Sequence, residues 1–134
     1  MLTEVHHIAF AVRDLEAGIT LFRRLTGRDV CWRGPVATRG AEVAVFRLDN
    51  MNIEVVSPTD PEGSLARYIE ERGEGFFHMA FAVDDVDRAR TQLQADGLAF
   101  RGEPYVAFRD WRIAYLDPSD TAGIPMHIIA RDAS

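Results

Sequence analysis

The chain has 134 residues, 47% of them hydrophobic, which suffices for one domain with a buried core and no disulfides. Its formal charge is −6 and its 15 basic residues are all arginine. Nucleic-acid binding is therefore not expected, and lysine chemistry, as in Schiff bases or Walker-type phosphate loops, is excluded. A single cysteine, no signal-peptide pattern and no long apolar run predict a cytoplasmic protein that does not bind membranes.

The first half of the chain predicts a strand, a helix and three more strands. Residues 5–14, VHHIAFAVRD, alternate as a strand does, and Asp14 can cap a helix that ends near Gly27. The apolar residues on one face of this helix are Leu15, Ile19 and Phe22. The later strand-like runs are residues 29–33, 41–48 and 51–56.

Residues 58–75 read as a connector. Pro58, Pro61 and Gly63 interrupt regular structure, and a short helix is expected from about Ser64.

The second half repeats the pattern of the first. In residues 76–85, FFHMAFAVDD, the residues His, Ala, Phe, Ala, Val and Asp return in the same order as in the opening strand, and Asp85 can cap a second helix that ends near Gly97. The apolar residues of this helix are Val86, Ala89 and Leu93. The strand-like runs that follow are residues 99–101, 111–116 and 125–130.

One βαβββ unit is thus used twice. Module 1 covers about residues 3–57 and module 2 about residues 76–131, within a single domain that spans residues 1–134. The predicted fold class is α+β, with the two tandem modules forming a curved, cup-shaped mixed sheet around a metal site.

The metal site is predicted from polar residues at equivalent places in the two modules. His7 opens the small-residue face of the first strand, and His78 does the same in module 2. In the last strand of each module Glu54 and His127 interrupt an apolar run. Each residue alone is more often a hydrogen-bonded core residue or an outward edge residue than a ligand, but the repetition favours two half-sites that converge on Zn, Co, Ni, Mn or Fe(II). His6 points to the opposite face.

These features resemble the vicinal oxygen chelate superfamily, which includes glyoxalase I, methylmalonyl-CoA epimerase, extradiol dioxygenases and the fosfomycin and bleomycin resistance proteins. The resemblance lies in the doubled module, the two H-[IM]-A-F-A-V-x-D strands and the segment DPSDTAG at residues 117–123. Within the superfamily the chain is most similar to the methylmalonyl-CoA epimerases. Their connector matches at Ile53, Glu54, Pro58, Ser64, Ala66, Gly73, Glu74, Gly75 and His78.

The resemblance implies that His7, Glu54 and His78 are metal ligands. At the end of the closing strand the epimerases and glyoxalases have a glutamate that is ligand and base, whereas this chain has His127. Three imidazoles and one carboxylate leave a divalent ion with a formal charge of about +1, which favours anionic ligands and enolate stabilisation. Glu54 is then the expected base, with His127 as the alternative.

Three functions are compatible with such a site. The favoured one is an isomerase, epimerase or lyase that transfers a proton α to a carbonyl or thioester through a metal-stabilised enolate. The second is an Fe(II)-dependent dioxygenase, since two histidines and one carboxylate can bind iron with open positions. The third is a resistance-type protein that binds a small molecule without chemistry.

The expected partners are a small-molecule substrate, possibly an acyl-CoA, and a second copy of the chain in a homodimer. Residues in module 2 that can shape the substrate cavity or form core are Phe108, Trp111 and Tyr115. Residues that can meet a substrate carboxylate or phosphate are Arg109 and Arg112.

Overall fold

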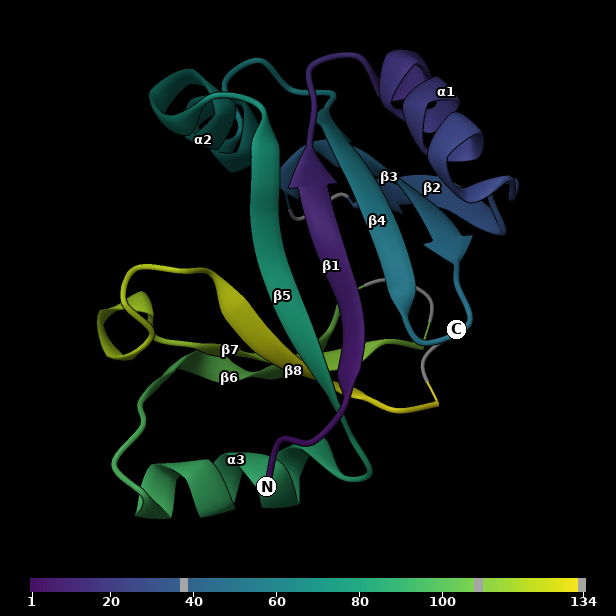
Figure 1. Ribbon diagram of the computed structural model, residues 1–134. Coiled ribbons are helices and arrows are strands. Elements are labelled where there is room, and N and C mark those ends of the chain that lie inside the picture. Colours follow the sequence, from purple (N-terminus) through teal and green to yellow (C-terminus); the bar gives the residue numbers. More distant parts are fainter. Residues whose placement is uncertain (37–38, 108–109, 133–134) are drawn as a thin grey trace. The chain divides into compact units, whose positions relative to one another are not determined.

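The computed structural model describes residues 1–36, 39–107 and 110–132 (Figure 1). The chain divides into two compact units. The first unit is His7–Phe77, and the second unit combines Met1–His6 with His78–Ser134. The first residues belong to the second unit because the Ala82 N–H donates to the Glu4 carbonyl and the Arg131 guanidinium pairs with the Glu4 carboxylate.

The first unit contains a four-stranded mixed sheet and two helices. Its elements in chain order are β1 (Val5–Ala11), α1 (Leu15–Thr26), β2 (Trp32–Val36), β3 (Ala41–Arg47), β4 (Asn52–Pro58) and α2 (Ser64–Arg72). The strand order is β2-β3-β4-β1, with β1 parallel to β4 and the other pairs antiparallel. Because β1 and β4 pair in parallel, the polar side chains of the two strands come close to each other in the sheet.

Helix α1 packs on one face of this sheet. Leu15 and Ile19 of the helix join Phe46, Ile53 and Val55 of the strands in a buried cluster. The half-buried residues that complete this cluster from β1 and its end are Ile8, Phe10 and Val12. The bulky face of the opening strand is therefore the core face, as its alternation predicts.

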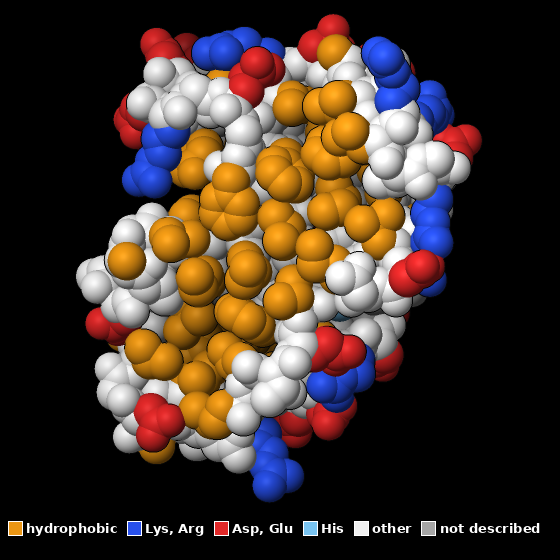
Figure 2. All heavy atoms as spheres, viewed as in Figure 1, with side chains coloured by type: hydrophobic (Ala, Val, Ile, Leu, Met, Phe, Trp, Pro, Cys, Tyr) orange, Lys and Arg blue, Asp and Glu red, His pale blue; other side chains and the backbone are white. Residues whose placement is uncertain are grey.

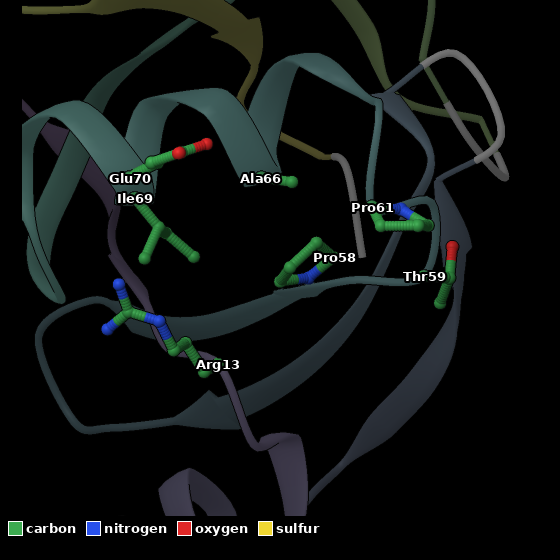
Figure 3. A pocket seen from close by; sticks show the side chains of 7 residues that line it. All are labelled: Arg13, Pro58, Thr59, Pro61, Ala66, Ile69 and Glu70. Carbon is green, nitrogen blue, oxygen red and sulfur yellow. The ribbon is translucent and has the colours of Figure 1, made fainter.

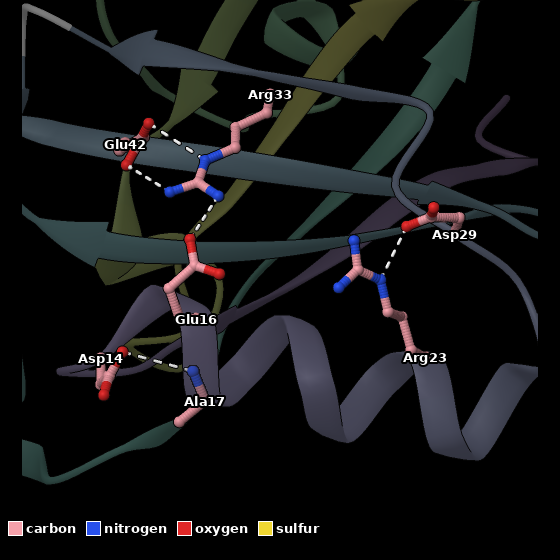
Figure 4. A network of polar contacts seen from close by, with 7 residues as sticks. All are labelled: Asp14, Glu16, Ala17, Arg23, Asp29, Arg33 and Glu42. Atoms are coloured by element: carbon pink, nitrogen blue, oxygen red, sulfur yellow. Dashed lines mark hydrogen bonds and ion pairs between the residues drawn. The ribbon is translucent and has the colours of Figure 1, made fainter.

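The N-terminus of α1 has the predicted cap. The Asp14 carboxylate accepts a hydrogen bond of 3.3 Å from the Ala17 N–H, and Gly27 ends the helix in a left-handed conformation at φ 67°. Arg33 of β2 pairs with Glu16 in the first turn and with Glu42 of β3, so the start of the helix is tied to the strands (Figure 4). These ion pairs are exposed, and we assign them little stability of their own.

The cap predicts a measurable loss on mutation. Replacing Asp14 with alanine leaves the Ala17 N–H without this acceptor, and we expect the free energy of unfolding to fall by about 1 kcal/mol in urea unfolding. Glu70, an exposed carboxylate within α2, is the control, since Glu70→Ala removes charge but no cap and should change stability by less than about 0.5 kcal/mol. Equal losses in the two variants would contradict the capping role.

The second unit repeats the arrangement. Its elements in chain order are β5 (Gly75–Val83), α3 (Val86–Ala95), β6 (Phe100–Val106), β7 (Arg112–Leu116), the 3₁₀ turn η2 (Pro118–Asp120) and β8 (Met126–Ala130). The strand order is β5-β8-β7-β6, with β5 parallel to β8. Asp85 caps α3 by accepting from the Arg88 N–H at 3.1 Å. The buried cluster between α3 and its sheet contains Val83, Val86, Leu93, Ala114 and Ile128.

Two strands differ from their predicted positions. The prediction of a strand at residues 29–33 is wrong in its bounds, because β2 runs over Trp32–Val36 and includes Gly34 and Pro35. As the edge strand, β2 tolerates a proline that donates no hydrogen bond, and the absent Cβ of Gly34 leaves room for the Trp32 ring. Likewise β6 extends to Val106 rather than stopping at residue 101, since a bulge accommodates its Gly and Pro.

The structure confirms the α+β fold class and the doubled βαβββ unit. It also confirms a helix in the connector, α2, which begins at Ser64 as predicted. In the described part of the chain, no helix has the length and apolar character needed to cross a membrane.

Candidate metal centre

The first unit brings His7 of β1 and Glu54 of β4 together. Because β1 and β4 pair in parallel with Ala9 opposite Glu54, both side chains lie on the face away from α1. The His7 Nε2 and Glu54 Oε2 atoms are 3.4 Å apart, and the two residues are only 1% and 3% exposed. Burial raises the pKa of Glu54 to about 8, and the charge of Arg39 acts against this rise.

The raised pKa predicts a pH-dependent stability in protein kept metal-free with a chelator. In the folded state Glu54 favours its neutral form, so its stabilising contribution is present below about pH 4.5 and is lost as the pH rises towards 8. Relative to Glu54→Gln, the wild type should lose about 1.4 kcal/mol of unfolding free energy per pH unit within this window. Urea unfolding of both proteins at pH 5, 6 and 7 measures the difference. The prediction is contradicted if the unfolding free energy of wild type minus that of Glu54→Gln stays constant or rises with pH.

The second unit brings His78 of β5 and His127 of β8 together in the equivalent places. Ala80 lies opposite His127 in the parallel pair, which puts both imidazoles on one face. Their ring centroids are 4.7 Å apart at an angle of 52°, and the residues are 6% and 3% exposed. Each unit thus buries one pair of side chains that can bind a metal.

The residues predicted to shape the substrate cavity or to meet a substrate anion have different surroundings. Trp111 packs its ring against His6 at 5.2 Å, and Arg112 forms an ion pair of 2.8 Å with Asp87 on the surface. Tyr115 instead contacts His127, with ring centroids 5.0 Å apart. The other two candidates, Phe108 and Arg109, lie outside the described residues. Tyr115 is thus a candidate residue in direct ring contact with a predicted metal ligand.

The donor chemistry of the two pairs fits a divalent cation. A buried carboxyl that is uncharged near neutral pH regains its charge when a cation lies beside it, which compensates the cost of burial. The buried imidazoles of His7, His78 and His127 are consistent with a divalent metal site. Nothing in this donor set selects one metal, because Zn, Co, Ni, Mn and Fe(II) all accept imidazole and carboxylate.

The first unit also has a cavity of about 440 Å³ that sequence reasoning missed. Figure 3 shows the side chains around it, with the charged groups of Arg13 and Glu70 at its rim and Ile69 on its wall. The other lining residues are Pro58, Thr59, Pro61 and Ala66. Arg13 comes from just after the end of β1, whereas the rest of the lining lies within residues 58–70, so the cavity forms only when these segments fold together. Its described lining includes neither His7 nor Glu54.

The class of this protein follows from a family match. Residues 6–115 match the model of the Glyoxalase/Bleomycin resistance protein/Dioxygenase superfamily, and the chain belongs to this superfamily. The match agrees with the doubled βαβββ unit and with the paired polar residues of the two units.

Epimerases are among the relatives. The chain is 29% identical to the ethylmalonyl-CoA/methylmalonyl-CoA epimerase of Cereibacter sphaeroides over 126 residues, which are 92% of this chain and 94% of that protein. It is 23% identical to the mitochondrial methylmalonyl-CoA epimerase of Homo sapiens over 125 residues, or 92% of this chain and 71% of that protein. These relatives confirm the likeness to epimerases that the connector motif indicates.

Solved structures of epimerases share the fold. A variant of the Streptomyces coelicolor methylmalonyl-CoA epimerase in complex with 2-nitronate-propionyl-CoA superposes with a TM-score of 0.90 at 24% identity, covering 99% of this chain and 97% of that chain. The enzyme from Mycobacterium tuberculosis gives a TM-score of 0.90 at 21% identity, covering 98% and 90%.

Proposed function

We propose that this protein is a metal-dependent isomerase or epimerase that moves the proton α to the carbonyl of a thioester or related substrate. The observation that supports this most is the repetition of a buried pair of donors, His7 with Glu54 and His78 with His127, at equivalent strands of the two units. Duplication of the unit also repeats apolar core residues such as Ala9 and Ala80, but four buried donor side chains cost free energy that a shared ion would offset.

In this proposal the buried donors of both units are ligands of a divalent ion. His7, His78, His127 and Glu54 would hold the ion. When bound, the ion acts as a Lewis acid that draws charge from a carbonyl or carboxylate oxygen. Three imidazoles and one carboxylate leave a formal charge of about +1, so the site favours an anionic ligand.

The chain's own residues provide the proton chemistry. Glu54 is the general base, because it is the carboxylate among the proposed site residues and lies where water has little access. His7, at 3.4 Å, holds the carboxylate on one side. His127 stands where the resemblance places a glutamate, and it is the second candidate base if it leaves the metal. Burial of both pairs excludes water and strengthens each electrostatic interaction.

An acyl-CoA is the substrate class that the relatives suggest. The Streptomyces coelicolor epimerase is known in complex with 2-nitronate-propionyl-CoA, and a methylmalonyl-CoA epimerase is known in complex with methylmalonyl-CoA. We extend this class to the present chain, and we place the reaction in the cytoplasm.

Deuterium wash-in tests the proposal directly. Protein purified without chelator is analysed for metals and then incubated with methylmalonyl-CoA in D₂O, and mass spectrometry follows deuterium at the α carbon. We expect about one divalent ion per chain and exchange that chelator abolishes and added metal restores. Bound iron with O₂-dependent consumption of an aromatic diol would instead identify a dioxygenase. Protein that binds substrate without metal or exchange would be a binding protein.

We also propose a homodimer. Ile8 and Phe10 of β1 are half-buried, and Figure 2 shows hydrophobic side chains gathered on the face of the first unit along β1 and β4. Light scattering should give twice the chain mass of 15.0 kDa, and a monomer at micromolar concentration would contradict this part of the proposal.

A further inference from the structure

Tyr115 lies directly beside His127 in the second unit. Strands β7 and β8 are antiparallel, and Tyr115 is the register partner of His127, so both side chains leave the same face of the sheet. Their ring centroids are 5.0 Å apart and the ring planes meet at 69°. This T-shaped geometry is a preferred arrangement of aromatic pairs.

The contact is part of a row of four rings on that face. Beyond His127 lies His78, with centroids 4.7 Å apart, and on the other side of Tyr115 lies Tyr105 of β6, with centroids 6.0 Å apart. The bulge of β6 between Arg101 and Tyr105 shifts the register at the point where Tyr105 enters the row. Tyr115 is therefore packed between Tyr105 and His127, and its ring has little freedom to turn.

The row has a physical consequence for His127. An imidazole in a strand can rotate about its terminal torsion, which is broad and two-fold, and a half-turn puts the ring carbons Cδ2 and Cε1 where Nδ1 and Nε2 were. A metal ligand must present one particular nitrogen in one direction. The ring of Tyr115 on one side and that of His78 on the other restrict this rotation before any ion arrives.

We infer that Tyr115 is a positioning residue that acts through its ring, holding the His127 imidazole in the orientation that metal binding requires. The metal in this inference rests on the proposed function, but the orientation of the His127 ring by Tyr115 does not depend on that function. The phenol hydroxyl has no part in it, so phenylalanine should serve as well as tyrosine. Residues that orient metal ligands typically change metal affinity by about 10- to 100-fold when they are replaced.

The experiment compares Tyr115→Leu and Tyr115→Met, which lack the ring, with Tyr115→Phe, which keeps it. Cobalt titration followed by visible absorption measures affinity and ligand geometry. We expect the two variants without a ring to bind Co²⁺ about 10- to 100-fold more weakly with an altered spectrum, and Tyr115→Phe to stay within about threefold of wild type. Tyr68→Leu is the matched control, because Tyr68 is a half-buried tyrosine of the first unit whose T-shaped partner is Phe77 at 4.8 Å.

A second readout uses chelator-treated protein. Side-chain ¹⁵N spectra, assigned with a His127→Gln variant, should show one dominant environment of the His127 ring in wild type and Tyr115→Phe, and line broadening or a second environment in Tyr115→Leu. Unchanged His127 signals in folded Tyr115→Leu would overturn the inference even if the wild type binds metal. An equal loss of affinity in Tyr115→Phe would overturn it too, by assigning the effect to the hydroxyl. Wild type that binds no Co²⁺ would refute the proposed metal site, and the ¹⁵N spectra would still decide the role of Tyr115.

Discussion

Glu54→Gln is expected to slow metal-dependent exchange of the α proton by about 10²- to 10⁴-fold, the range that a positioned general base contributes. Glutamine has the shape of glutamate and keeps an oxygen that can face a cation, but its amide accepts no proton at working pH. The fold should be unaffected, because the buried site already favours an uncharged side chain at this position. The loss should therefore appear in kcat, with metal content near that of wild type.

Glu42→Gln is the control for this experiment. Glu42 is a carboxylate of the neighbouring strand β3 whose partner, Arg33, is on the surface, so its replacement removes the same charge away from the proposed site. Exchange in Glu42→Gln should stay within about twofold of wild type, as expected for an exposed ion pair. If Glu54→Gln retains full exchange while His127→Gln loses it, the base is His127 and our assignment of roles is wrong.

Much of the fold could be predicted because the signals are local. The caps Asp14 and Asp85, the alternation of the opening strands and the glycine at the end of α1 each act within a few residues. The errors fall on β2 and β6, the edge strands of the described sheet. Glycine and proline look like turn signals there but cost little, because among the described residues one side of each strand pairs with no other strand. A single sequence does not tell which strand lies at the edge.

The pairs of the candidate site could be predicted for another reason. Repetition in the chain placed His7 and His78 at equivalent strands, and alternation then put Glu54 and His127 on the same faces. The raised pKa of Glu54, the opposing charge of Arg39 and the contact of Tyr115 with His127 depend instead on register and burial. Those are properties of the folded sheet, so no residue spacing in the sequence predicts them.

His127→Ala tests the proposed ligand that distinguishes this chain from the pattern it resembles. Removing one of the four proposed donors should weaken binding of a divalent ion by at least about 100-fold, since even the replacement of groups that only orient a ligand costs 10- to 100-fold. His127→Glu should restore affinity, because a carboxylate is an equally suitable donor and makes the site formally neutral. The site of His127→Glu should then show a weaker preference for anionic ligands than the wild-type site. Competition of Co²⁺ with a chelator measures the affinities, and inhibition by a small dicarboxylate measures the preference for anions.

His6 provides the matched control for this series. It is as buried as His78 and lies next to His7 in β1, but its ring packs on Trp111 at 5.2 Å and it belongs to neither pair. His6→Gln can lower stability through the lost ring contact, yet it should leave metal affinity within about threefold of wild type, because the replaced imidazole is not a donor. If His6→Gln and His127→Ala lose affinity equally, loss of packing rather than loss of a ligand explains both. If His127→Ala binds metal normally but loses exchange, then His127 is the base, and the ion is held by His7, Glu54 and His78.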